Sequence, residues 1–255
     1  MKLAVVIPVY NELELLPKLL ARLDATPPPP GPGGSPVERI VVLIDDGSQD
    51  GTADLVAAEG EKAGRVAAAH RINQGKGAAL RTGFAAALEA GADVLIVQDG
   101  DLEYDPSDHG AVLAPILDGR ADAVIGSRFI GQTHRVLYYW HYVANRMITF
   151  FSNALTNLNL SDIECCFKAF TAEAASKLDL RENRFGVEPE IVAKLARMRL
   201  PEPAEDGGAH ARTRVARVYE VAVSYAGRTY AEGKKITWRD GVAALRCIVT
   251  YNLLR

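Results

Sequence analysis

Acidic side chains are concentrated directly after one of the most apolar short runs of the sequence. Asp99, Asp101 and Glu103 follow the run 94–97 at alternate positions. An extended segment would place all three on one side, because successive side chains of a strand point to opposite faces. Such hard oxygen ligands favour Mg²⁺ or Mn²⁺, which complete their coordination shell with phosphate oxygens and water. The spacing therefore predicts a divalent metal and a phosphate-bearing substrate, since a simple polar turn would explain only one or two of these acids.

Polar residues also follow two other apolar runs. Asp46 lies after the second run, and Pro8, Tyr10, Asn11 and Glu12 lie at the end of the first. In open α/β sheets ligands bind outside the carboxyl ends of the strands. The residues after these two runs should therefore lie in one crevice with the three acids that follow 94–97. The ring and polar groups of the first segment suit a nucleobase and ribose. For Asn11 a helix N-cap is the simpler alternative.

A glycine-rich segment, 73–77, carries Lys76 between two glycines at the start of an expected helix. It matches neither the phosphate loop of ATPases nor a dinucleotide-binding fingerprint, because Ser or Thr does not follow Lys76 and the third glycine is absent. Anion binding at a helix start is still compatible with the segment.

Basic side chains that could bind phosphate lie later in the sequence. Arg128 lies in the sequence GSRF, and Arg228, Lys234 and Lys235 lie in a segment with glycines at 227 and 233. A glycine-flanked basic loop can close over a diphosphate. Ordinary surface charge explains the spacing equally well.

The elements that must position these residues alternate between strand and helix patterns. This order is typical of a mostly parallel sheet covered by helices. We expect strands at 3–7, 39–44, 65–69, 94–98, 123–126 and 217–223. We expect helices at 13–23, 53–63, 78–89, 172–178 and 189–198, and from residue 238 onward. Segments 26–36 and 201–214, rich in proline, glycine or charge, are expected to be flexible insertions in one α/β domain.

An aromatic-rich stretch, 136–154, has its apolar positions on one helical face. Packing against the core is one explanation, and a surface for a lipid chain or membrane interface is the other. Polar residues interrupt the stretch, so it falls short of the ~20 consecutive apolar residues of a membrane span. Contact with a membrane would then be peripheral.

Composition restricts the class of protein. Hydrophobic residues make up 48% of the 255 residues, which is enough for a sizeable core. A net charge of −3 supplies no field for a nucleic-acid backbone, so nucleic acid is not an expected partner. The three cysteines lack disulfide-framework or zinc-site spacing, which suits a reducing compartment. The N-terminal residues lack the basic region, apolar region and cleavage site of a secretory signal peptide. We expect a cytoplasmic protein that acts in the cytoplasm or at the inner face of the membrane.

Six motifs taken together resemble the family 2 glycosyltransferases of the GT-A fold, and most of all the dolichol- and polyprenol-phosphate mannosyltransferase branch. In order along residues 3–238, they are VVIPVYNE, DDGSQDGT, NQGKGAALRTG, QDGDLEYDP, GSRF and RTYAEGKKI. The resemblance implies a single Rossmann-like GT-A domain over residues 1–255, with the nucleotide sugar bound by 1–130 and the acceptor by 131–255. It implies inverting transfer of mannose or glucose from GDP-mannose or UDP-glucose to a polyprenyl or dolichyl phosphate.

The resemblance also implies roles for single residues. The metal, Mg²⁺ or Mn²⁺, would be held by Asp101 and Glu103. The catalytic residues would be Asp101, Arg228, Lys234 and Asp162. The donor would be bound by Pro8, Tyr10, Asn11, Glu12, Asp46, Lys76, Asp99, Gly100, Asp101 and Arg128.

The sequence departs from the family pattern at two positions, and the second bears on the acceptor. Gly100 replaces a usual Ala, which should not change ligation, and Glu164 stands where Thr is common. A phosphate acceptor needs no protein base, because a phosphomonoester with a second pKa of about 6 is largely dianionic at neutral pH. A hydroxyl acceptor would need a carboxylate such as Asp162 or Glu164 to take its proton. A glycosyltransferase for a soluble saccharide or small-molecule hydroxyl is therefore the main alternative, and a non-catalytic nucleotide-sugar-binding protein a minor one.

Overall fold

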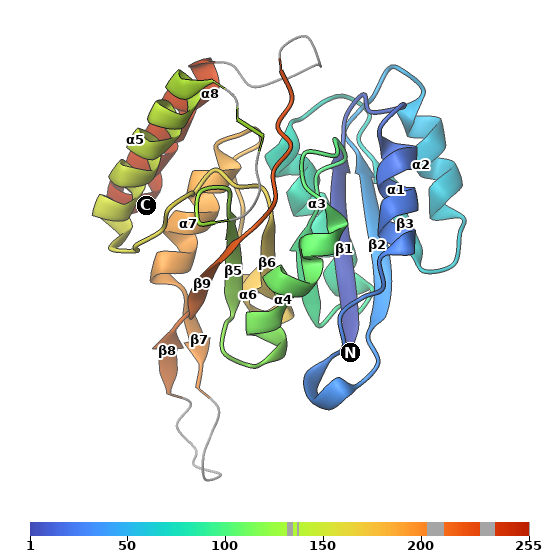
Figure 1. The fold of residues 1–255 in the computed structure, drawn as a ribbon, viewed down its shortest axis with the longest axis horizontal. Coiled ribbons are helices and arrows are strands. Elements are labelled where there is room, and N and C mark those ends of the chain that lie inside the picture. Colours follow the sequence, from blue (N-terminus) through green and yellow to red (C-terminus); the bar gives the residue numbers. More distant parts are fainter. Residues whose placement is uncertain (132–134, 137, 203–211, 230–237, 255) are drawn as a thin grey trace.

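A mixed sheet forms the centre of the molecule (Figure 1). The computed structural model describes residues 1–131, 135–136, 138–202, 212–229 and 238–254. Within them, seven strands are arranged in the order β3-β2-β1-β4-β6-β5-β9. Their bounds are β1 (Lys2–Val9), β2 (Glu38–Asp45), β3 (Arg65–Ala69), β4 (Val94–Val97), β5 (Ala123–Ser127), β6 (Lys168–Thr171) and β9 (Val218–Ala222).

The direction of the strands decides where a site can form. β6 runs antiparallel to both of its neighbours, and the other paired strands of the sheet are parallel. The parallel strands therefore end at one edge, and Lys168, the first residue of β6, lies at that same edge opposite Val97. β1 pairs with β2 on one side and with β4 on the other, so the strand order reverses there, as at the ligand-binding crevices of open α/β sheets.

Helices cover both faces of the sheet. Alternate residues of β1 belong to separate apolar clusters: Leu3, Val5 and Ile7 pack with α1, α2 and α4, and Ala4 and Val6 pack with α3 and the later helices. This explains the continuous apolar runs, because a strand buried on both faces needs no polar side. The helices are α1 (Leu16–Ala25), α2 (Thr52–Gly60), α3 (Lys76–Glu89), α4 (His109–Leu117), α5 (Tyr139–Thr156), α6 (Ala172–Lys177), α7 (Val187–Arg197) and α8 (Trp238–Val249).

The predicted order of elements is confirmed for the first half, and the mixed α/β single-domain fold is confirmed as a whole. β6 and α4 were not predicted. The first predicted insertion, 26–36, contains a 3₁₀ turn at Pro32–Gly34. The predicted insertion 201–214 has strand structure at its two ends, where β7 (Arg199–Pro201) and β8 (Thr213–Val215) pair antiparallel. Residues 203–211 lie outside the described part.

The aromatic-rich stretch forms α5, which is attached to the rest of the molecule by a narrow side. Its buried residues are Ile148, Thr149 and Ser152, whereas Trp140 is 75% exposed and Phe150 67%. Core packing therefore does not account for its aromatic residues. No helix in the described ranges has both the length and the apolar character needed to cross a membrane.

Candidate active site

A cavity of about 340 Å³ opens at the carboxyl edge of the sheet. The residues predicted from the sequence that line it are Pro8, Tyr10, Glu12, Asp46, Lys76, Asp99, Gly100, Asp101, Glu103, Arg128 and Arg228. Asn11 and Asp162 are not among the lining residues, and Lys234 lies outside the described part of the chain. One crevice thus collects side chains from the ends of β1, β2, β4, β5 and β9.

Three carboxylates surround the guanidinium group of Arg228. Its Nη2 donates to Oδ2 of Asp101 at 2.7 Å, its backbone N–H donates to Oε1 of Glu103 at 2.9 Å, and Oε1 of Glu12 lies 3.5 Å away. Burial, with Asp99 and Glu103 nearby, raises the pKa of Asp101 to about 7, although Arg228 acts in the opposite direction. Three carboxylates around one guanidinium group carry more negative charge than that group neutralises.

Glu103 also fixes the segment that carries Arg228. Its carboxylate accepts a hydrogen bond from the Tyr225 hydroxyl at 3.0 Å, and its backbone carbonyl accepts one from the N–H of Ala226 at 2.9 Å. Burial, and then the charge of Glu103, raise the pKa of Tyr225, so the phenol stays a donor. The acid after β4 and the segment after β9 are therefore one connected unit.

Lys76 is paired within the protein. Its ammonium group lies 2.7 Å from Asp99 and 3.4 Å from Glu188, which also pairs with the buried Lys168. Burial opposes the charge of Lys76, but the carboxylates outweigh it and raise its pKa well above the usual value. Burial likewise opposes ionisation of Asp99, and Lys76 lowers its pKa. Lys76 lines the cavity, but these contacts give its charge a structural partner rather than leaving it for an anion.

The glycines beside Lys76 allow another segment to come close. A Cβ on Gly77 would lie 2.1 Å from the carbonyl oxygen of Glu182, and one on Gly75 would lie 2.4 Å from that of Asn183. Ala78 donates its backbone N–H to Asn183 at 3.1 Å. The close approach brings the loop before α7, with Arg184 and Phe185, to the cavity wall. The glycine-rich segment is therefore explained by packing.

Asp46 holds the same glycine-rich segment from the other side. Its carboxylate accepts hydrogen bonds from the backbone of Gln74 at 3.0 Å and of Gly75 at 2.7 Å, and lies 2.6 Å from Nδ1 of His70. Asn11 has a left-handed φ of 52°, and its Oδ1 accepts a hydrogen bond from the backbone of Gln49. It thus joins the ends of β1 and β2; it is not the N-cap of α1, which is Leu15.

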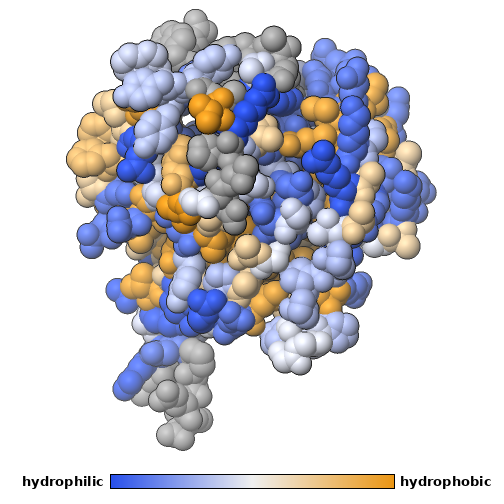
Figure 2. All heavy atoms as spheres, in the orientation of Figure 1, coloured by the Kyte–Doolittle hydropathy of each residue, from blue (hydrophilic) through white to orange (hydrophobic). Residues whose placement is uncertain are grey.

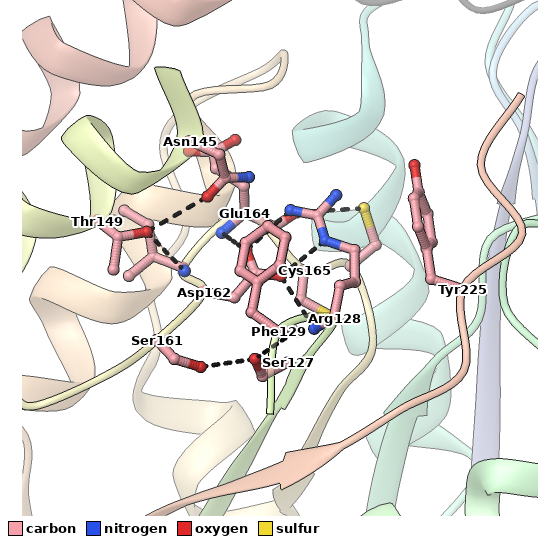
Figure 3. A network of polar contacts seen from close by, with 12 residues as sticks. Ser127, Arg128, Phe129, Asn145, Thr149, Ser161, Asp162, Glu164, Cys165 and Tyr225 are labelled. Atoms are coloured by element: carbon pink, nitrogen blue, oxygen red, sulfur yellow. Dashed lines mark hydrogen bonds and ion pairs between the residues drawn. The ribbon is translucent and has the colours of Figure 1, made fainter. Parts of the chain in front are cut away.

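Arg128 is held by a bidentate ion pair (Figure 3). Its Nε and Nη2 donate to the two carboxylate oxygens of Asp162 at 2.6 and 2.8 Å, and the rings of Tyr225 and Phe129 lie 5.1 and 5.5 Å from the guanidinium carbon. Asp162 is fully buried and accepts a further hydrogen bond from the backbone of Glu164. These contacts suit a residue that positions Arg128, and they leave Asp162 without access to the cavity.

Glu164 is the carboxylate in the cavity wall with the fewest partners. Its Oε1 is buried and accepts no hydrogen bond within the described residues. Burial, and then the charge of Glu188, raise its pKa to about 7. The sequence singled out Glu164 as a departure from a family pattern and as a base for a hydroxyl acceptor, but nothing local indicates that Glu188 will be its neighbour.

Several other wall residues were not singled out from the sequence. They are Asn73, Tyr104, Cys166, Arg184, Phe185 and Tyr225. A phenylalanine between arginine and glycine in a polar stretch was a usable signal for Phe185. For the others, only the tertiary structure shows their place.

The carboxylates near Arg228 are the candidate ligands for a divalent cation. Among the described residues, no group of three or more His, Cys, Asp or Glu side chains is arranged to hold a metal ion. Two carboxylates, Asp101 and Glu103, nevertheless meet around a cation, the guanidinium of Arg228, and both supply hard oxygen ligands. A Cβ on Gly100 would make only ordinary contacts, at 3.7 Å or more, so Gly100 places no special demand on the segment between the acids. These residues fit a Mg²⁺ or Mn²⁺ ion whose remaining ligands come from phosphate and water.

Comparisons with known proteins find relatives that match most of the chain. An undecaprenyl-phosphate mannosyltransferase from Micrococcus luteus is 31% identical over 207 residues, covering 78% of this chain and 79% of the relative. A polyprenol monophosphomannose synthase from Mycolicibacterium smegmatis is 32% identical over 182 residues, covering 69% of this chain and 64% of the relative.

The fold is also found in solved structures. Glucosyl-3-phosphoglycerate synthase from Mycobacterium tuberculosis, in complex with Mn²⁺, UDP and phosphoglyceric acid, superposes with a TM-score of 0.68 over 100% of this chain and 79% of that one, at 15% identity. This likeness identifies the GT-A fold. The model of the family described as "Glycosyl transferase family 2" matches residues 4–179, which include β1 to β6 and most of the cavity wall. The chain is therefore a glycosyltransferase and belongs to glycosyl transferase family 2.

Proposed function

We propose that this enzyme transfers a hexose, with inversion, from a nucleoside diphosphate sugar to a polyprenyl phosphate. The observation that carries the proposal is the cluster of Asp101, Glu103 and Arg228, where surplus negative charge and a guanidinium group meet in one cavity. Such a cluster suits a diphosphate with its cation. The printed names of the relatives, undecaprenyl-phosphate mannosyltransferase and polyprenol monophosphomannose synthase, support the acceptor.

The residues assigned to the donor follow from the cavity wall. Tyr10 and Glu12 after β1 and Asp46 after β2 lie where the nucleoside would be bound, with Asp46 fixing the glycine-rich segment. Asp101 and Glu103 would hold Mg²⁺ or Mn²⁺, which supplies positive charge to the leaving diphosphate. Arg228 would exchange its carboxylate partners for a phosphate oxygen as the donor binds. Lys234 is proposed to join it.

The acceptor side of the proposal rests on charge. Arg128 is fixed by Asp162 and faces the cavity, so it can bind a phosphate without having to be ordered first. A phosphate dianion attacks the anomeric carbon without giving up a proton to the protein, because its second pKa is about 6. Arg228 would then stabilise the departing diphosphate. We propose that residues 1–130 chiefly bind the donor and 131–255 the acceptor.

The donor belongs to one of two candidates, GDP-mannose or UDP-glucose. A ligand that binds only the native state raises the melting temperature, so each nucleotide sugar with Mg²⁺ or Mn²⁺ can be compared by thermal shift. The donor should raise the melting temperature more with the cation than without it. Equal shifts with and without the cation would contradict the metal assignment.

The acceptor is tested by the partition of labelled sugar. Purified enzyme with labelled donor and a polyprenyl phosphate should move label into an organic phase, in a product that mild acid hydrolyses. The matched control is the same polyprenol without its phosphate, which should accept no label. Label on the free alcohol, or on neither lipid with either donor, would refute the proposal.

Glu164 supports a second candidate, transfer to a hydroxyl group of a soluble acceptor. A base for such an acceptor needs a pKa near the operating pH, and burial with Glu188 raises the pKa of Glu164 to about 7. Glu164→Gln separates the two functions. A loss of more than about a hundredfold in turnover would favour the hydroxyl acceptor, because general bases contribute on that scale, and little change would favour the phosphate.

The proposed acceptor sets the place of action. Relatives named for undecaprenyl phosphate act on a lipid, so we propose that this enzyme works at the inner, cytoplasmic face of a membrane. The cysteines of the structure are free thiols, as a reducing compartment allows.

A further inference from the structure

Large apolar side chains that face solvent are concentrated on two neighbouring helices. Of the twenty such residues in the described part of the chain, fourteen belong to α5 and the residues before it, or to α8 and the π-helical turn Thr250–Leu254 that follows. Along α8 and the π-helical turn they recur at helical spacing, at Val242, Leu245, Val249 and Leu253. On α5 the corresponding residues are Tyr139, Trp140, Tyr142, Met147, Phe150, Phe151 and Leu155.

We call the exposed apolar residues of these two neighbouring helices the α5–α8 face. The two helices pack against each other and lie side by side at the end of the molecule away from β3 (Figure 1). In Figure 2 hydrophobic side chains gather on the edge of the molecule where α5 lies. Exposed apolar side chains that cluster on neighbouring elements mark interaction sites more often than scattered ones do, so we expect the face to have a partner.

The charges on the face select the kind of partner. Arg135, Arg146 and Arg246 are exposed beside the apolar residues. Asp240 is the one carboxylate within the described residues of α5, α8 and the π-helical turn. Tyrosine and tryptophan suit a boundary between water and hydrocarbon, because each has an apolar body and a polar tip. Cations around such a surface attract anionic lipid head groups.

The α5–α8 face is continuous with the acceptor side of the cavity. Phe129, next to Arg128, packs edge-on against Tyr142 of α5 at 5.2 Å. Arg146 donates to the carbonyl of Ser161 at 3.0 Å, directly before the Asp162 that holds Arg128. The helix that presents the aromatic residues is thus attached to the two segments that position Arg128.

From these observations we infer that the α5–α8 face docks on a bilayer containing anionic phospholipid and holds the Arg128 side of the cavity at the lipid surface. The apolar residues enter the head-group region, and the arginines bind the lipid phosphates. The partner in this inference is the bilayer itself, and only the purpose of the docking rests on the proposed acceptor.

Vesicle sedimentation tests the inference. The full chain should sediment with vesicles of phosphatidylcholine and phosphatidylglycerol, and less with phosphatidylcholine alone. Trp140→Gln with Phe150→Gln, and separately Val242→Gln with Leu245→Gln, should each weaken binding to the anionic vesicles by about tenfold, because each pair removes two apolar side chains from the boundary. Glutamine preserves helix propensity. The matched control, Leu13→Gln with Val215→Gln, changes two exposed apolar residues outside the face and should bind as the unchanged protein does.

The outcomes separate docking from the proposed reaction. Transfer to a short, water-soluble prenyl phosphate should be unchanged in both face variants, since neither pair lines the cavity. If the protein binds vesicles but transfers sugar to no prenyl phosphate, the docking inference is supported and the proposed acceptor is refuted. The docking would be overturned if the unchanged protein stayed in the supernatant with anionic vesicles. It would also be overturned if the protein were a dimer that dissociates in the face variants, because a second copy of the chain would then cover the face.

Discussion

At the scale of single residues, the cavity balances most of its charges within the protein. Lys76 pairs with Asp99, Arg128 with Asp162, and Arg228 with Asp101. Burial and the neighbouring acids raise the pKa of Asp101 to about 7, whereas the pKa of Asp99 is lowered beside Lys76, so the pair with Arg228 should exchange for a ligand more readily than the pair with Lys76. The sequence indicates anion binding for all three basic residues, whereas the structure gives each a different set of contacts.

Asp101→Asn should lower turnover by about a hundredfold or more at saturating donor, because the proposed metal loses a charged ligand. The melting temperature should be equal or higher, since burial and the neighbouring acids already raise the pKa of Asp101 to about 7. Steady-state kinetics and thermal unfolding measure both effects. Asp118→Asn, at an exposed ion pair with Arg120, is the control. A variant that keeps more than half of the turnover would remove Asp101 from the metal site.

Glu164 should make stability depend on pH. Its pKa is about 7 in the folded protein against 4.5 for the free group, so the unfolded state releases the proton first as pH rises. The stability that Glu164 contributes is present below pH 4.5 and is lost by about pH 7, and Glu164→Gln removes this loss. The variant should match the wild type near pH 4 and exceed it by about 3 kcal/mol at pH 8.

Urea unfolding at the two pH values measures this difference, with Glu61→Gln, at an exposed carboxylate, as the control. Parallel stability curves for Glu164→Gln and the wild type would show that Glu164 ionises normally.

The candidate site was predicted from sequence only as far as neighbouring residues determine it. The acids after β4 and the residues after β1 were recognised because strand ends collect ligands. The structural partner of Lys76, Glu188, could not be predicted, because it begins a helix more than a hundred residues later. The burial of Asp162 behind Arg128 is likewise a tertiary property.

At the scale of elements, the contact of α3 with the loop before α7 shapes the cavity. Gly77→Ala should lower the free energy of unfolding by about 2 kcal/mol or more, because its Cβ would overlap the backbone of Glu182. Gly110→Ala in α4, where no atom lies within 4 Å of the new Cβ, should instead raise it by about 0.5–1 kcal/mol. Urea unfolding compares the two variants. Similar changes in both would contradict the close approach at Gly77.

The strands were predictable to different degrees. β1 and β2 were recognised as continuous apolar runs whose residues are mostly buried, and β3 as a short run of mostly partly buried residues at the edge of the sheet. β6 was missed because it is short and begins with a buried lysine, Lys168, whose charge is satisfied by Glu188. The β7–β8 hairpin was missed because its paired residues flank a segment whose composition indicates disorder.

At the scale of the whole molecule, both halves of the chain build one cavity. Asp46 and Asp101 come from the first half, and Arg184 and Arg228 come from the second. The α5–α8 face lies beyond α7, outside the central sheet, and its first helix contacts the segments around Arg128. This arrangement would let one molecule hold a soluble donor in the crevice while resting on a bilayer.

The central claim, a lipid phosphate as acceptor, is tested most directly by competition in one reaction. Labelled donor, divalent cation, vesicles carrying a polyprenyl phosphate and an equal concentration of phosphoglyceric acid, the soluble acid bound by a structural neighbour, are incubated with the enzyme. We predict that label enters the organic phase and that phosphoglyceric acid does not reduce it. Label that stays in the aqueous phase on phosphoglyceric acid, with none on the lipid, would contradict the account.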